Sequence, residues 1–151
     1  MKSLLVLIAL LSFFTPALAE ESPEAELLAS DIKGRRADIV AEVMQLSDSQ
    51  GEIFWPIYEE MQLEMDHLRK SQRELIQEYL AVYNNLSDEV AGAMMLQVLE
   101  LEKTELGIKK KYFGKIGEAL SIKTAARFLQ VENQIDLLLD AKTAAELPLI
   151  K

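Results

Sequence analysis

The sequence predicts an all-α protein: an elongated antiparallel helical hairpin with a short N-terminal helix and a C-terminal return helix, four helices in all. Three observations lead to this fold class. Leu-Ser pairs stand where helices should begin, apolar residues recur every seven positions, and no segment predicts a strand.

Composition excludes several classes of protein and site. Half of the 151 residues are hydrophobic, which is too many for a disordered chain. The chain has no Cys and one His, so it cannot build a disulfide scaffold, a thiolate metal site or a multi-His metal centre by itself. With 16 Lys and Arg against 25 Asp and Glu, it is also poorly suited to bind nucleic acid.

The N-terminus has the parts of a secretory signal peptide. Lys2 precedes an apolar run over residues 4–14, and Ala17-Leu18-Ala19 follows as a cleavage site. The run is about half of the ~20 residues that a membrane-spanning helix needs. We therefore expect residues 1–19 to be a signal peptide, with export to the periplasm and no transmembrane anchor after cleavage. Residues 20–30 should form a flexible acidic segment, and residues 31–151 a single helical domain.

Serine caps mark the predicted helix starts. Leu46-Ser47 is followed by Gln50, which completes a capping box, and Ser87 and Ser121 follow the same Leu-Ser pattern. Ser30-Asp31 can cap a short first helix. The three longer helices are expected from Ser47 to Asn84, from Ser87 to about Leu120, and from Ser121 to about Asp140.

The second helix carries a coiled-coil type of seam. Two apolar columns recur with seven-residue spacing, interrupted only by Gln72: Phe54, Met61, Leu68, Leu75, Val82 and Tyr58, Met65, Gln72, Tyr79, Leu86. Such a helix is ~55 Å long, which predicts an elongated shape. Pro56 lies inside it, so we expect a kink there rather than a later helix start. The third helix has its own column: Leu99, Leu106, Phe113 and Leu120.

Charges favour an antiparallel pairing of the second and third helices. The pairing predicts that opposite charges meet and that two glycines face aromatic residues: Arg69, Lys70 and Arg73 near Glu100, Glu102 and Glu105; Lys109, Lys110 and Lys111 near Glu59, Glu60 and Glu64; Gly114 and Gly117 near Phe54, Trp55 and Tyr58. A slip of three or four residues is the alternative.

The last helix has charges that oppose its dipole. Lys123 and Arg127 stand near its start, whereas Glu132, Asp136 and Asp140 form a self-repelling ladder toward its end. Groups outside the helix must compensate. Salt bridges within the fold or a dimer are one explanation, and a basic partner surface or a weakly bound cation is the other.

A metal site and a catalytic site have little support. Glu64 and His67, with Met61 and Met65, could form a weak soft-metal site, but both methionines lie on the apolar seam and core packing is the simpler explanation. Serine has no accompanying base, and no Gly-rich phosphate loop follows a strand. We therefore expect neither an enzyme nor a cofactor.

The segment from Leu46 to Gln50, the long helix, the hairpin and the signal peptide together resemble the LTxxQ family of periplasmic stress proteins, the Spy and CpxP type. Ser47 replaces the Thr of the motif, and Leu120-Ser121 keeps only part of a second copy. A closer resemblance is to a group of exported bacterial helical proteins. Their sequences contain stretches similar to Phe54-Trp55-Pro56-Ile57-Tyr58 and to residues 123–133.

The resemblance implies a homodimer that holds unfolded or signalling protein clients without ATP, or that regulates a stress-sensing pathway. The residues expected to serve client binding are Phe54, Trp55, Ile57 and Tyr58, with Arg127 and Glu132 ordering the last helix. Ordinary core packing is the alternative for each of them. Two other functions stay open, namely an accessory protein in metal sensing or resistance and a structural dimerisation module without a small ligand.

Overall fold

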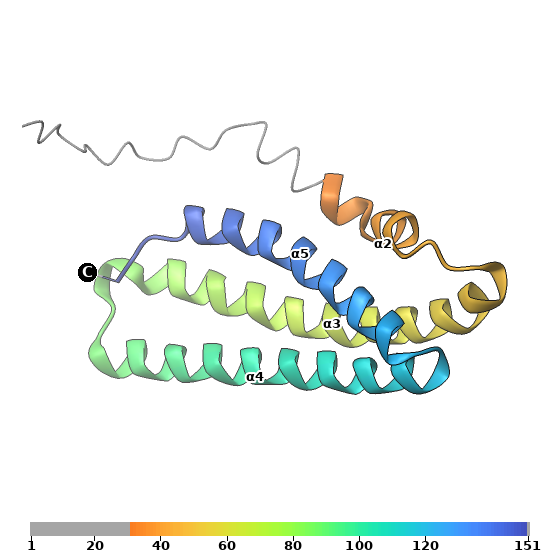
Figure 1. Ribbon diagram of the computed structural model, residues 1–151. Coiled ribbons are helices and arrows are strands. Elements are labelled where there is room, and N and C mark those ends of the chain that lie inside the picture. Colours follow the sequence, from red (N-terminus) through yellow and green to blue (C-terminus); the bar gives the residue numbers. More distant parts are fainter. Residues whose placement is uncertain (1–30, 151) are drawn as a thin grey trace, which may run out of the picture.

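The computed structural model describes residues 31–150, and every regular element within them is a helix (Figure 1). The all-α prediction is therefore confirmed. A helical turn over residues 31–34 leads into these elements: α2 (Arg36–Met44), α3 (Asp48–Val82), a 3₁₀ turn η1 (Tyr83–Asn85), α4 (Asp88–Ala119) and α5 (Ile122–Glu146). The predicted signal peptide and the acidic segment 20–30 lie outside the described residues. None of the helices in the described part is long and apolar enough to span a membrane.

The three long helices begin directly after the predicted serines. The Ser47 side chain accepts from the Gln50 backbone N–H, while the Ser47 N–H donates to Gln50 Oε1 at 3.0 Å, so the capping box is present. Ser87 and Ser121 each accept from the backbone N–H three residues on. α3 continues through Pro56, which confirms the start at Ser47.

The core lies mainly where the N-terminal half of α3 packs against α2, the C-terminal part of α4 and the N-terminal part of α5. On α3 it uses the predicted seam, and α5 adds Phe128, whose ring centroid lies 5.2 Å from that of Phe54. The buried apolar residues are Val40, Met44, Phe54, Tyr58, Met61, Met65, Leu68, Leu75, Ile108, Tyr112, Ile116, Ala125, Phe128, Val131 and Ile135.

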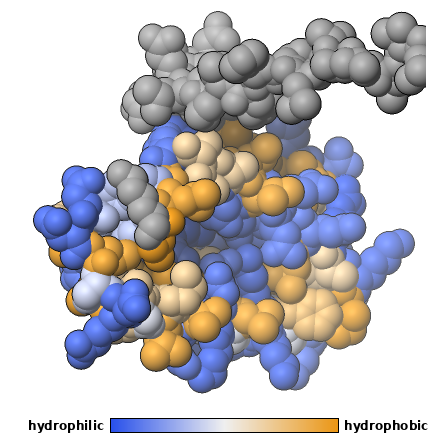
Figure 2. All heavy atoms as spheres, turned by 90° about the vertical axis from the view of Figure 1, so that its left-hand side faces the viewer, coloured by the Kyte–Doolittle hydropathy of each residue, from blue (hydrophilic) through white to orange (hydrophobic). Residues whose placement is uncertain are grey.

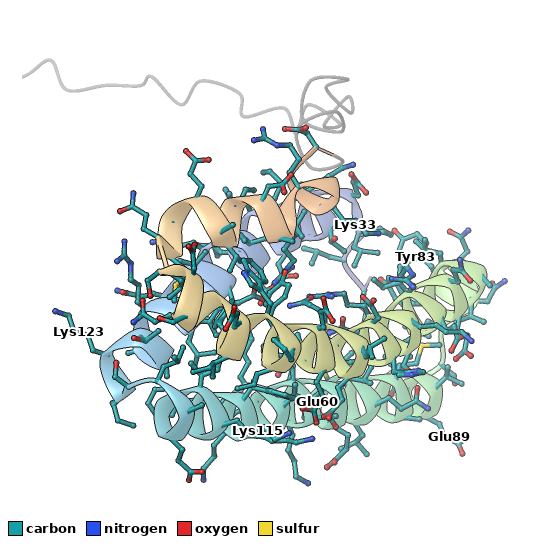
Figure 3. All side chains as sticks on the ribbon, turned by 90° about the vertical axis from the view of Figure 1, so that its right-hand side faces the viewer. Lys33, Glu60, Tyr83, Glu89, Lys115 and Lys123 are labelled. Atoms are coloured by element: carbon teal, nitrogen blue, oxygen red, sulfur yellow. The ribbon has the colours of Figure 1, made fainter. Side chains whose placement is uncertain are left out.

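α4 runs antiparallel to α3, displaced by about one helical turn from the predicted pairing. Lys115 binds Glu60 at 2.7 Å, as Figure 3 shows between the two helices. Lys111 binds Glu64, and the Tyr112 hydroxyl donates to the same carboxylate at 2.7 Å.

The predicted contacts of Arg69 and Lys70 with Glu100, Glu102 and Glu105 are wrong. Arg69 donates to Gln62 and Asp66, and Lys70 pairs with Glu74, all on α3 itself. Exposed ion pairs contribute only ~0.2–1 kcal/mol each, so core packing sets the register instead.

The predicted seven-residue column of α4 is only partly in the core, because Phe113 and Leu120 pack against the core whereas Leu99 and Leu106 do not. Ile108, Tyr112 and Ile116 point inward, while Leu99 and Leu106 are 51 % and 68 % exposed. The glycine contacts predicted with Phe54, Trp55 and Tyr58 are wrong too. A Cβ at Gly114 would meet nothing within 4 Å, and one at Gly117 would lie 2.8 Å from Ile122 Cδ1 of α5. Gly117 therefore lets α5 turn back closely against α4.

The C-terminal segment folds back onto α3, where the Tyr79 hydroxyl donates to the Pro148 carbonyl at 2.6 Å. Figure 2 views this end of the molecule, where apolar and polar side chains are mixed on the surface. Beyond this contact, Leu149 is almost fully exposed.

Candidate functional site

The four aromatic and apolar residues expected to bind a client occupy two different environments. Phe54 and Tyr58 are buried and pack against Phe128, so their side chains serve the core. Trp55 and Ile57 are half-buried. Of the four, only these two present surface that a partner could reach.

Trp55 lines a hollow of about 540 Å³ at the junction of α2 and α3. The wall from α2 and the following loop comprises Ala41, Leu46 and Ser47, and the wall from α3 comprises Asp48, Gly51, Glu52, Trp55 and Pro56. The hollow thus lies beside the predicted LTxxQ-like segment.

Local backbone features shape the hollow. Gln45 ends α2 in the left-handed conformation with φ 48°, and the Ser47 capping box then starts α3 in a new direction. Gly51 is buried and lies under the indole of Trp55. A Cβ at Gly51 would lie 3.5 Å from both Cδ1 and Nε1 of that indole. Trp55 in turn makes edge contacts with Phe54 and Tyr58, with ring centroids 5.1 and 5.4 Å apart. The indole is therefore a fixed surface.

The lining combines apolar surface with negative charge. Among the lining residues Leu46, Trp55 and Pro56 are apolar, and Asp48 and Glu52 each carry a carboxylate. Such a site suits an apolar side chain that has a Lys or Arg next to it, because the base can meet the carboxylates while the apolar group covers the indole.

The α2 wall is held in place by a buried ion pair to α5. Arg36 Nη2 lies 2.6 Å from Glu132 Oε2 and 2.6 Å from Asp136 Oδ1, and the Glu132 side chain is fully buried. Gln62 of α3 donates a longer hydrogen bond to Glu132. Burial disfavours the charged guanidinium, but the two carboxylates outweigh this effect and raise the pKa of Arg36.

Arg127 fixes the other end of α2. Its Nη2 donates to the Val43 carbonyl at 2.6 Å, in the last turn of α2, where carbonyls lack helical partners. Arg127 and Glu132 were expected to order the last helix. The described hydrogen bonds of both side chains join α5 to α2, and Glu132 also accepts from Gln62 of α3, so both residues position a wall of the Trp55 hollow.

The acidic ladder of α5 is compensated within the fold, as one of the two explanations predicted. Arg36 pairs with its first two members, and Lys109 of α4 lies 2.9 Å from Asp136 Oδ2 and 2.7 Å from Glu105. Burial acts to raise the pKa of Asp136, but Arg36 and Lys109 outweigh it and hold that pKa below its ordinary value. Asp140 differs, because burial and repulsion from Asp136 and Glu105 raise its pKa.

The residues of the weak metal site are not assembled into one. Met61 and Met65 are buried in the core, Glu64 binds Lys111 and Tyr112, and His67 is exposed. Within residues 31–150 no group of three or more His, Asp and Glu side chains is placed to hold a metal ion.

Comparison with protein-family models, with curated proteins and with solved structures finds no match to the chain.

Sequence reasoning missed Arg36 and the α2 wall. Arg36 and Glu132 are 96 positions apart, and nothing local to either residue indicates the other. The unpaired ladder on α5 was the one available signal, since it required a cation from elsewhere. Gly51 was missed because its role depends on where the indole of Trp55 lies.

Glu132→Ala should lower the free energy of unfolding by about 3 kcal/mol, because it leaves Arg36 buried with one carboxylate in place of two. Urea unfolding followed by circular dichroism measures the change, with the adjacent exposed Asn133→Ala as matched control. The double variant Arg36→Met/Glu132→Leu should recover most of the loss. If Glu132→Ala and Asn133→Ala lowered the free energy of unfolding equally, the buried ion pair would not stabilise the fold as described.

Asp140→Asn should stabilise the protein near neutral pH by up to about 0.5 kcal/mol, because it removes a repelled carboxylate. Since the pKa of Asp140 is raised on folding, its contribution is favourable at low pH and is lost as pH rises through the raised pKa. The gain should therefore vanish below about pH 4.

Asp136→Asn provides the opposite case. Its pKa is lowered on folding, so its contribution is present above the ordinary Asp pKa and is lost as pH falls through the lowered value. Thermal unfolding of Asp136→Asn and Asp140→Asn at neutral and acidic pH tests the two opposite pKa directions. If the effects of the two substitutions on stability change with pH in the same direction, these pKa directions are wrong.

Proposed function

We propose that the protein is an exported, non-catalytic binding protein that holds apolar segments of unfolded or signalling proteins, without ATP, at the Trp55 hollow. The supporting observation is a half-buried Trp on a fixed aromatic base, facing a hollow of about 540 Å³ with two carboxylates in its lining. A hollow of this volume accepts one or two large side chains rather than a whole folded partner.

The preferred client segment carries an aromatic or long aliphatic residue beside Lys or Arg. Burial of such a residue against Trp55 contributes ~1.5–3 kcal/mol, so a single site gives weak and reversible binding. Weak binding with this broad chemistry fits a protein that meets many unfolded clients, and also one that modulates a sensor.

Export and dimerisation belong to the same proposal. The signal-peptide features of residues 1–19 support a periplasmic location, and the likeness of Leu46 to Gln50 to the LTxxQ motif supports envelope stress as the setting. We take the protein to act as a homodimer, in which two hollows would raise the avidity for one extended client.

Light scattering from a reduced or heat-unfolded client tests the function. The protein at a sub-equimolar ratio, without ATP, should suppress aggregation, and Trp55→Ala should remove most of the suppression because it removes the apolar floor of the hollow. Leu63→Ala, at an exposed leucine of α3 that does not line the hollow, is the matched control.

A charge reversal keeps the test valid if Trp55→Ala perturbs folding. Glu52→Lys lies on the exposed part of the lining and should weaken suppression of basic clients more than of acidic ones. Suppression that is equal in the wild type, Trp55→Ala and Glu52→Lys would exclude the hollow as the client site.

A further inference from the structure

α4 presents a row of apolar side chains to solvent. Leu99 and Leu106 belong to it, together with Met95 and Leu96, which are 51 % and 66 % exposed. The opposite side of α4 supplies the core residues Ile108, Tyr112 and Ile116, so packing within the chain does not use this row. Exposed apolar residues that recur along one side of a helix, here interrupted by Lys103, mark an interaction surface, unlike single ones.

The row has the geometry of a helix-pairing seam. At about 3.6 residues per turn, Gly92, Leu99, Leu106 and Lys110 project to the same side of α4. Leu99 and Leu106 are seven residues apart, as in a coiled coil. A Cβ at Gly92 would meet no atom within 4 Å, so the backbone there is open to a large side chain from outside. We define the α4 face as Gly92, Met95, Leu96, Leu99, Leu106 and Lys110.

Charge at the two ends of this face is self-complementary. Glu89, labelled at the start of α4 in Figure 3, and Lys110 both lack an ion-pair partner among residues 31–150, whereas Lys109 and Lys111 are paired within the chain. A two-fold axis near Leu99 places Glu89 of one copy beside Lys110 of the other. The same axis sets Leu99 against its own symmetry mate and Leu106 against Gly92.

We propose that a second copy of this chain covers the α4 face, in an antiparallel contact between the two α4 helices with the two-fold axis near Leu99. The inference rests on the proposed function only in taking the protein to act as a homodimer; the face and the register come from α4. The contact extends over ~32 Å from Glu89 to Lys110. It lies on a different part of the surface from the Trp55 hollow, so both hollows stay open.

Sedimentation equilibrium of the purified protein tests the contact. The wild type should sediment as a dimer, and Leu99→Glu should weaken dimerisation at least tenfold because two carboxylates then meet at the axis. Leu137→Glu changes an equally exposed leucine, on α5, and should leave the dimer intact. Circular dichroism should show the same helix content in all three proteins.

Charge reversal tests the register. Glu89→Lys and Lys110→Glu should each weaken the dimer by up to about fivefold, and the double variant should restore it. Because the chain has no Cys, Leu99→Cys introduces a single thiol that should form a disulfide-linked dimer under mild oxidation, while Leu63→Cys should not.

A wild-type protein that is monomeric at all concentrations, or a Leu99→Glu variant that stays fully dimeric, would overturn the proposal. If the wild type is monomeric and Leu99→Glu also loses aggregation suppression, the α4 face is a client site instead. A dimer broken by Leu99→Glu in a protein that suppresses no aggregation would support this interface and refute the proposed client binding.

Discussion

The buried ion pair between Arg36 and Glu132 is the interaction on which the rest of the arrangement depends. α2 has nine residues, and so short a helix is not stable in water by itself. It stays folded because Val40 and Met44 enter the core while Arg36 and the Arg127 contact attach both of its ends to α5. Arg36, together with Lys109, also offsets the charges of Glu132 and Asp136 in the acidic ladder of α5. One wall of the Trp55 hollow therefore depends on the attachment of α2 to α5.

Local signals made much of the fold predictable. The Ser47 capping box, the other two serine caps and the seven-residue column of α3 depend on neighbours within one or two helical turns. The three caps are observed, and the column is buried from Phe54 to Leu75, whereas Val82 is exposed. The register between α3 and α4 differs from the first prediction by about one helical turn, which is the slip given as the alternative, because exposed charges fix a register less precisely than the buried contacts of Tyr112 and its neighbours. Heptad spacing alone also could not tell which apolar residues of α4 face inward: Ile108, Tyr112 and Ile116 do, whereas Leu99 and Leu106 stay exposed.

The candidate site was only partly predictable, because long-range contacts as well as local ones form it. Trp55 and Ile57 are marked by their residue types, but the hollow beside Trp55 needs the loop after Gln45 and the long-range attachment of α2. Phe54 and Tyr58 have the same residue types and serve the core instead. The two surfaces then divide the work that we propose: the acidic hollow for clients, and the α4 face for a second copy of the chain.

The most direct test of client binding uses Trp55 itself, the single Trp of the chain. Its fluorescence is measured while a short peptide with Leu or Phe beside Lys is added, and binding is followed in parallel by the anisotropy of a dye on the peptide. The proposal predicts a saturable blue shift of the Trp55 emission with the same midpoint as the anisotropy change, and a weaker midpoint in Glu52→Lys. Saturable anisotropy with an unchanged Trp55 emission would show that clients bind elsewhere and would contradict the account.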